Sequence, residues 1–448
     1  MNKSSILLRS SITAALGGLL FGFDTVVISG AEKTIQSLWG LSDGIHGLAI
    51  SMALWGTVLG ALIGGIPTEK FGRKNTLIGI GILYFVSAIW SGLAFSPYDF
   101  MVARFLGGMG IGISTVVSPL YISEIAPPER RGRLTGLYQF NIVAGILIAF
   151  LSNYLIGKFM LSDSAWRWML GVEAIPALFY ILASLSVPES PRWLLARNKR
   201  PEAAEILRRL EPEMSVEDTE QRITEITSAD TESKTGLQIP FLSKPLLKPI
   251  SLAFFIAFFN QLSGINAILY FAPRIFEMTG LGTKAALLQS IGIGFTNLIF
   301  TFVGLWLIDR IGRKKLLIIG SFGYIISLGL CAWAFKTENF GIVPLTIFFF
   351  IASHAVGQGA VIWVFISEIF PDRHRAAGQS LGTSTHWVLA ALITLAFPIA
   401  VGAFAPELIF GFFAFMMILQ LIWVVTLVPE TKGIPLEKVF KNLGTSKP

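Results

Sequence analysis

The stretch "GGIPTEKFGRKNTLIGIG" (residues 64–81) returns 240 residues later as "GLWLIDRIGRKKLLIIGSFG" (304–323), with Arg73 matching Arg313. Three blocks that recur in one order and at nearly one spacing predict a chain made of two similar halves. The other two repeated blocks are "ISEIAPPERRGRLTG" (122–136) with "ISEIFPDRHRAAGQS" (366–380), and "VPESP" (187–191) with "VPETK" (428–432).

Long apolar runs surround these blocks. Of the 448 residues, 53% are hydrophobic and 14% are charged, whereas soluble domains carry about 25% charged residues. The runs are about 20 residues long, enough for an α-helix to cross a roughly 30 Å hydrocarbon core. We predict an all-α membrane protein with twelve transmembrane helices in two six-helix parallel-repeat bundles. The predicted spans are 10–30, 46–67, 75–95, 98–120, 133–157, 168–187, 247–275, 285–308, 315–335, 342–370, 376–402 and 406–428.

Basic residues are distributed unequally between the two sets of loops. With both termini on one side, the loops and adjoining span ends on that side hold 28 Lys and Arg, and the opposite loops hold five. The positive-inside rule therefore predicts cytoplasmic termini. The dispersed charge is not a nucleic-acid footprint. The predicted parts are an N-terminal bundle (1–187), a cytoplasmic helical linker (188–246) and a C-terminal bundle with a short cytoplasmic tail (247–448).

The sequence lacks the usual signatures of enzymes and metal sites. No His, Cys and carboxylate cluster has metal-ligand spacing, and no phosphate-binding P-loop is present. The lone cysteine, Cys331, has no partner for an internal disulfide. We therefore expect no enzyme activity, no cofactor and no metal. A parallel repeat in a membrane instead favours rocking of one half against the other around a midplane site.

From about Gly17 to Gly433 the chain resembles the sugar porter family of the major facilitator superfamily. The resemblance implies alternating-access transport of a monosaccharide across a cell membrane, either proton-coupled or facilitative. The motifs that carry it are "FGRK" (71–74), "IGRK" (311–314), "PESPRWLL" (188–195), "NQLSGINAILYF" (260–271) and "PETKG" (429–433).

Three charged residues are predicted at one depth in the membrane. Asp24 lies six residues from the outer end of its span, Arg104 six residues into its span, and Glu173 five. At a rise of 1.5 Å per residue, all three lie about 8–9 Å below the outer edge. Two carboxylates and one guanidinium carry a net charge of −1, which one proton neutralises.

Two interpretations of this charge group stay open. Intramembrane ionisable residues usually serve function, so one carboxylate could bind and release a proton while Arg104 keeps the other ionised. The resemblance agrees, because proton-coupled sugar porters have Asp at the position of Asp24, whereas animal facilitators often have Asn. The alternative is a permanent ion pair that only fastens the helices together.

The midplane of the second half is rich in neutral polar residues. Paired donors and acceptors of amides suit sugar hydroxyls, and indole rings suit the C–H faces of a sugar ring. The alternative is that these side chains only bond one helix to another, and either histidine could be structural. The candidate substrate-binding residues are Gln139, Asn260, Gln261, Asn266, Asn297, His354, Trp363, His386 and Trp387.

The resemblance assigns the sugar site to most of these residues and a gating role to Tyr270. Asn260 stands where the family usually has Gln. His354 and His386 are similar to histidines of animal fructose facilitators, whereas Trp363 is typical of glucose and xylose carriers. The sequence therefore leans toward fructose, with another hexose or pentose, or a polyol, left open.

Charged residues repeat at the predicted cytoplasmic helix ends. In the family, such residues form ion pairs that close the inner gate, and they also anchor topology. The candidate gating residues are Arg73, Glu124 and Arg131 in the first half, and Arg313, Glu368 and Arg375 in the second.

The first functional hypothesis is a monosaccharide:proton symporter in the cell membrane. Its partners would be the sugar, the proton and the lipid bilayer, and we expect a monomer to suffice. A facilitative uniporter is the main alternative. A sugar sensor or a drug/proton antiporter is weaker, since the tails are short and the fifth span lacks a Gly-Pro kink motif.

Overall fold

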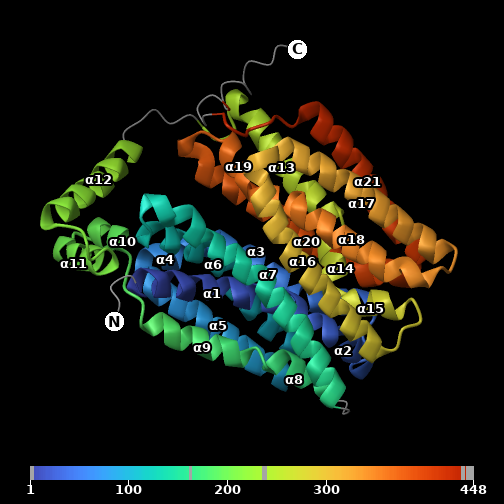
Figure 1. Ribbon diagram of the computed structural model, residues 1–448. Helices are drawn as coiled ribbons and strands as arrows, with labels where there is room; N and C mark the ends of the chain where they lie inside the picture. Colours follow the sequence, from blue (N-terminus) through green and yellow to red (C-terminus); the bar gives the residue numbers. More distant parts are fainter. Residues whose placement is uncertain (1–4, 161–163, 235–239, 435–438, 440–448) are drawn as a thin grey trace.

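The computed structural model describes residues 5–160, 164–234, 240–434 and 439. These residues form helices and their connections, with twelve helical spans long and apolar enough to cross a membrane. Figure 1 shows two bundles side by side, the blue-to-green helices α1–α9 and the yellow-to-red helices α13–α21. The fold class predicted from the sequence is therefore confirmed.

The first bundle has six membrane spans. Two of them contain a break or a change of helix type: α1 continues into a 3-10 turn, and α8 gives way to α9 around Glu173. The helices are α1 (Ser5–Val27), η1 (Ile28–Gly30), α2 (Glu32–Leu38), α3 (Asp43–Ile63), α4 (Gly65–Phe71), α5 (Arg73–Leu93), α6 (Pro97–Ile125), α7 (Pro128–Phe159), α8 (Ala165–Gly171) and α9 (Ala174–Leu185).

The second bundle repeats this plan with deeper interruptions. The predicted span 247–275 is three helices, because Gly264 adopts a left-handed conformation with φ of 86° and the helix stops again at Phe271. The predicted span 342–370 is interrupted at Gly357. The helices are η2 (Lys244–Leu246), α13 (Leu247–Leu262), α14 (Ile265–Tyr270), α15 (Ala272–Glu277), α16 (Thr283–Ile311), α17 (Arg313–Lys336), η3 (Phe340–Ile342), α18 (Val343–Val356), α19 (Gln358–Ile369), α20 (Asp372–Ala403) and α21 (Pro406–Leu427).

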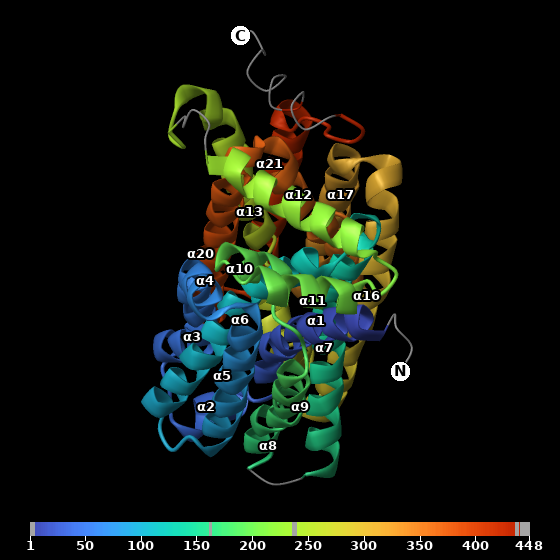
Figure 2. The same cartoon turned by 90° about the vertical axis from the view of Figure 1, so that its left-hand side faces the viewer.

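Three short helices connect the bundles and lie at one end of the molecule, which we call the linker end (Figure 2). They are α10 (Pro191–Ala196), α11 (Arg200–Leu210) and α12 (Val216–Lys234). The opposite end, with α2, α8 and α15 (Figure 1), is the far end. The tail predicted after residue 434 lies outside the described residues except for Val439.

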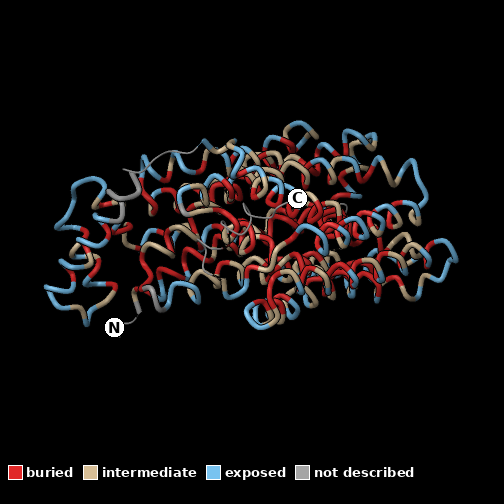
Figure 3. The backbone as a smooth tube through the Cα atoms, turned by 90° about the horizontal axis from the view of Figure 1, so that it is seen from above, coloured by how far each residue is buried: buried red, intermediate tan, exposed pale blue. Residues whose placement is uncertain are grey.

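Helices of the two bundles pack directly against each other. α3 contacts α20, and α7 contacts α16. A Cβ atom on Gly47 of α3 would lie 2.1 Å from the carbonyl oxygen of Leu395 on α20, so the two backbones touch near the far end. Buried positions run between the helices, whereas the linker helices are largely exposed (Figure 3).

Candidate functional site

Asp24 and Arg104 form a buried ion pair between α1 and α6. The Asp24 Oδ1 atom accepts a hydrogen bond from Nη1 of Arg104 at 2.5 Å, and Nη2 donates to the Asp24 carbonyl oxygen at 3.0 Å. The two side chains are 1% and 2% exposed. An isolated charge at this depth is costly. Each side chain here has an opposite charge beside it, which offsets part of that cost.

Glu173 adds a second carboxylate beside this pair. It lies at the break between α8 and α9, is 2% exposed, and has Asp24 and Arg104 as its neighbouring charges. Among the described residues, its Oε1 atom has no hydrogen-bond partner. The structure therefore brings together the three charges predicted at one depth. Their formal sum is −1, so one bound proton makes the group neutral.

The break between α13 and α14 supports a buried amide network. Gln261 is fully buried and its Nε2 atom bonds Asn260 Oδ1 at 2.9 Å, while Asn266 donates to Gln261 Oε1 at 2.6 Å. Across the bundle, Gln261 Nε2 lies 3.1 Å from Nδ1 of His386 on α20. Four predicted site residues thus form one connected group.

Aromatic rings line one side of this network. The ring of His386 lies 5.1 Å from that of Trp363 and 4.7 Å from that of Trp387. Trp387 also packs edge-on against Phe21 of α1, at 5.5 Å, so the aromatic group reaches the other bundle. The Nε1–H of Trp387 is buried and has no hydrogen-bond partner among the described residues.

The remaining predicted binding residues lie on three other helices. Gln139 on α7 and Asn297 on α16 are half-buried. His354 on α18 bonds the hydroxyl of Tyr324 at 2.7 Å. That contact favours the structural interpretation of His354, since no bond between His354 and the Gln261 network is present among the described residues.

Tyr270, the predicted gating residue, ends α14 and is fully buried. Asp24 and Arg104 are the charged residues that interact electrostatically with Tyr270. Its hydroxyl has no hydrogen-bond partner among the described residues. Because α14 also contacts α1, Tyr270 links the sugar-site helix to the charged group.

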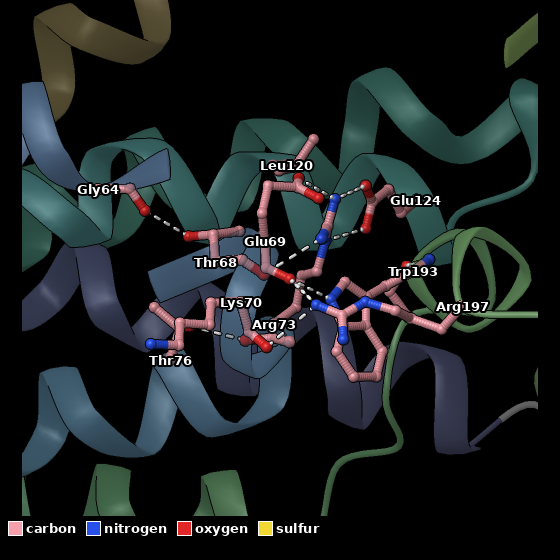
Figure 4. A network of polar contacts seen from close by, with 12 residues as sticks. Gly64, Thr68, Glu69, Lys70, Arg73, Thr76, Leu120, Glu124, Trp193 and Arg197 are labelled. Atoms are coloured by element: carbon pink, nitrogen blue, oxygen red, sulfur yellow. Dashed lines mark hydrogen bonds and ion pairs between the residues drawn. The ribbon is translucent and has the colours of Figure 1, made fainter. Parts of the chain in front are cut away.

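At the linker end, Arg73 joins α4, α5 and α6 (Figure 4). Its Nε and Nη2 atoms bond both carboxylate oxygens of Glu124, at 2.9 and 2.8 Å, and Nη2 lies 3.0 Å from Glu69. Glu189 accepts hydrogen bonds from the backbone N–H groups of Arg73 and Lys74. Burial raises the pKa of the Glu189 carboxyl, and these backbone donors lower it.

The second half repeats this arrangement. Arg313 bonds Glu368 at 3.0 and 2.7 Å, and Glu430 accepts from the backbone N–H of Arg313 at 2.9 Å. Gly72 and Gly312 precede the two arginines, with φ of 91° and 98°. A Cβ atom there would lie 2.2 and 2.5 Å from the capping glutamate oxygens. The repeated sequence motifs thus form two equivalent ion-pair clusters, one around Arg73 and one around Arg313.

These ion pairs lie within their own bundles. Arg375 donates to the Ser367 carbonyl oxygen at 3.0 Å, which is also a contact inside the second bundle. Arg131 is exposed at the start of α7. Closure of an inner gate by these six residues therefore stays a prediction.

Sequence reasoning missed a polar group at the far end, formed by Glu32, Gln36, Asp43, His46 and Arg274. Three of these residues lie in the loop 31–45 between two predicted spans, and His46 is the first residue of the next span, where polarity alone indicates nothing unusual. Arg274, predicted within a span and left without a role, was the signal. A second missed group is the buried amide pair Gln358–Gln420, 2.9 Å apart.

No group of three or more His, Cys, Asp or Glu that could hold a metal ion is present in the part of the chain that the structure describes.

Comparisons with known proteins agree with this geometry. A family model described as "Sugar (and other) transporter" matches residues 10–443. The chain is 33% identical to the D-xylose-proton symporter of Escherichia coli, over 98% of this chain and 96% of that protein. It is 37% identical to the arabinose-proton symporter of Bacillus subtilis, over 96% and 94%.

Among solved structures, the chain is similar to a partially occluded, inward-open form of the xylose transporter of Escherichia coli. The TM-score is 0.86 at 31% identity, covering 96% of this chain and 100% of that one. The chain therefore belongs to the sugar transporter family of the major facilitator superfamily and is a multi-pass membrane protein.

Proposed function

We propose that this protein is a proton-coupled symporter of a neutral monosaccharide. The observation that carries the proposal is the buried group of Asp24, Arg104 and Glu173, whose net charge of −1 is removed by one proton. Ionisable residues inside a membrane are costly and usually serve function, for example in proton relays. The names of the relatives, which pair a sugar with a proton, support the same function.

The sugar we propose is an aldose, either a pentose or a hexose. The network around Gln261 and His386 offers neutral donors and acceptors beside indole rings, as a sugar requires. The relatives are named for xylose and arabinose, and none of these names supports the lean toward fructose. His354 is one of the two histidines that favoured fructose, and its bond to Tyr324 favours a structural role instead.

Transport would occur by rocking of the bundle 1–187 against the bundle 247–448, with 188–246 as the linker. We assign this structure to the inward-facing state. Its likeness to an inward-open transporter supports the assignment, as do polar contacts that join the bundles at the far end. The two ion-pair clusters around Arg73 and Arg313 would then form the inner gate in the outward-facing state. A monomer would be the working unit.

The linker end is assigned to the cytoplasm and the far end to the outside. The reason is the excess of Lys and Arg in the loops of the linker end. We expect a cysteine at Glu213, in the linker, to resist an impermeant thiol reagent added to intact cells. A cysteine at Lys158, at the far end of α7, should react. Both positions are exposed, and preferential labelling at position 213 would reverse the orientation.

The proposed function is tested by uptake of radiolabelled xylose, arabinose and glucose into energised vesicles. A symporter accumulates its sugar above the outside concentration, and a protonophore abolishes this accumulation. Counterflow in the same vesicles needs no net proton cycle and should survive the protonophore. Uptake that stops at equilibrium and ignores the protonophore would identify a uniporter instead.

A further inference from the structure

A continuous series of polar contacts joins the two bundles at the far end, which is the proposed outer end. Arg274 on α15 donates a hydrogen bond from Nε to Glu32 on α2 at 2.9 Å, and its Nη2 atom lies 2.8 Å from the other carboxylate oxygen of Glu32 in an ion pair. Nη2 also donates to Gln36 at 2.5 Å, and Gln36 donates to Asp43 of α3 at 2.9 Å. Arg274 and Glu32 are 242 residues apart and belong to different bundles.

His46 completes this series from the inside. Its Nε2 atom lies 2.7 Å from the second oxygen of Glu32, and the side chains are 0% and 1% exposed. The Nδ1 atom of His46 is buried without a partner among the described residues. A neutral imidazole that donates from Nε2 therefore keeps a free proton acceptor at Nδ1.

The helices that pack near His46 differ in the charges they carry. Glu32 and Arg274 face it from α2 and α15, and Asp43 lies on its own helix. The outer part of α6 carries Asp99, which accepts hydrogen bonds from Trp90 and from the backbone N–H of Phe95, and further in Arg104, which pairs with Asp24. No charged residue of α20 lies in its outer part, from Gly382 to Ala403.

The polar group around Arg274 carries a net negative charge. Glu32 and Asp43 are acidic and Arg274 is basic, whereas Lys33 and Glu277 form a separate ion pair whose charges cancel. The net charge is −1 while His46 is neutral, and protonation of His46 makes it zero. Imidazole is the side chain that normally changes charge between pH 5 and 8.

We propose that Glu32, Gln36, Asp43, His46 and Arg274 form an outer latch that holds the transporter closed to the outside, and that proton uptake by His46 tightens it. The proton enters while the outer end is open and hydrated. On closure, the imidazolium meets the carboxylate of Glu32 in a buried site. The latch is distinct from the Asp24 group, and it rests on the alternating access of the proposed function.

The test measures the outer opening directly. Spin labels on cysteines at Ser37 of α2 and Lys284 of α16, both exposed positions on opposite bundles, report the distance between the outer ends. The background carries Cys331→Ala. In lipid nanodiscs without sugar, we expect the open fraction to rise about tenfold from pH 5.5 to 8, the ratio for 1.4 kcal/mol of lost interaction.

Three variants separate the parts of the latch. Arg274→Gln removes the bond between the bundles and should raise the open fraction at least about tenfold at every pH, since a buried charge loses its partner. His46→Asn keeps a donor for Glu32 but cannot gain charge, so its open fraction should not change with pH. Lys33→Gln cuts the exposed pair with Glu277 at the same height, where Lys33 is 63% exposed, and should change little.

Glu32→Gln checks the same bond from the other bundle if Arg274→Gln does not fold. An unchanged distance distribution in Arg274→Gln and Glu32→Gln would overturn the latch. A pH response that persists in His46→Asn would overturn the role of His46. The measurement uses neither sugar nor a proton gradient, so its failure is distinguishable from failure of the proposed function.

Discussion

Replacing Asp24 by Asn should abolish accumulation of sugar against its gradient while sparing exchange. The amide keeps the shape and can still bond Arg104, but the titratable group is lost from the pair with Arg104. A membrane potential of 100 mV contributes about 2.3 kcal/mol per charge moved, so one proton drives roughly 40-fold accumulation in the wild type. In the variant, uptake should stop at equilibrium, as measured in energised vesicles.

Two further measurements make this prediction specific. Asp99→Asn changes a half-buried carboxylate near the start of the same helix that carries Arg104, and it should keep full accumulation. Counterflow by Asp24→Asn should remain measurable, because exchange needs no proton release. Loss of counterflow in a folded variant would indicate that the ion pair is structural. Continued accumulation by the variant would exclude Asp24 as the coupling residue.

The variant Glu173→Gln distinguishes which of the two carboxylates, Asp24 or Glu173, binds the transported proton. If Asp24 is the titrating group, the amide at position 173 should leave some coupled uptake. The unpartnered Oε1 atom of Glu173 makes this carboxylate the other candidate, and then Glu173→Gln would show the uptake defect instead.

The membrane architecture could be predicted because it depends on local properties. Hydropathy identifies each span, and the bilayer requires every spanning backbone to satisfy its own hydrogen bonds in a helix. A fixed rise per residue also places side chains at a depth. For this reason the sequence predicts Asp24, Arg104 and Glu173, which are far apart along the chain, at one depth in the membrane.

Interruptions of the helices were harder to predict. Gly264 is an ordinary signal for a loosened helix, and the structure has a left-handed residue there. The second stop at Phe271 and the interruption at Gly357 have no comparable local signal, since glycine is frequent in membrane helices that continue. At Gly357, close packing of α18 against α17 requires a glycine, because a Cβ atom there would lie 2.9 Å from the Cα atom of Gly320.

Pairing across the bundles could not be predicted from spacing. Glu32 lies in a region that hydropathy assigns to a loop, and its partner Arg274 is 242 residues away. Depth alone made His354 a candidate for the sugar site, but its rotation about the helix axis directs it to Tyr324. Distance along a helix is fixed by its rise, whereas direction depends on which neighbours pack against it.

Gln261→Ala should weaken sugar binding more than any other change in the amide network. Gln261 bonds Asn260, Asn266 and His386, so its removal leaves buried polar groups without partners as well as removing a group that faces the proposed sugar. Each such loss costs about 1–3 kcal/mol, or roughly tenfold to a hundredfold in affinity. Competition in counterflow and calorimetric titration with xylose and glucose measure the change.

Gln420→Ala is the matched control. Gln420 is also fully buried, and it joins Gln358 of α19 to Ser321 of α17. These contacts fasten helices of one bundle, so we expect a lower melting temperature and nearly unchanged affinity. If both variants lose stability equally and neither loses affinity, the amides around Gln261 only bond helix to helix, and the sugar must bind elsewhere. Weak binding by Gln261→Ala alone places the sugar against α13 and α20.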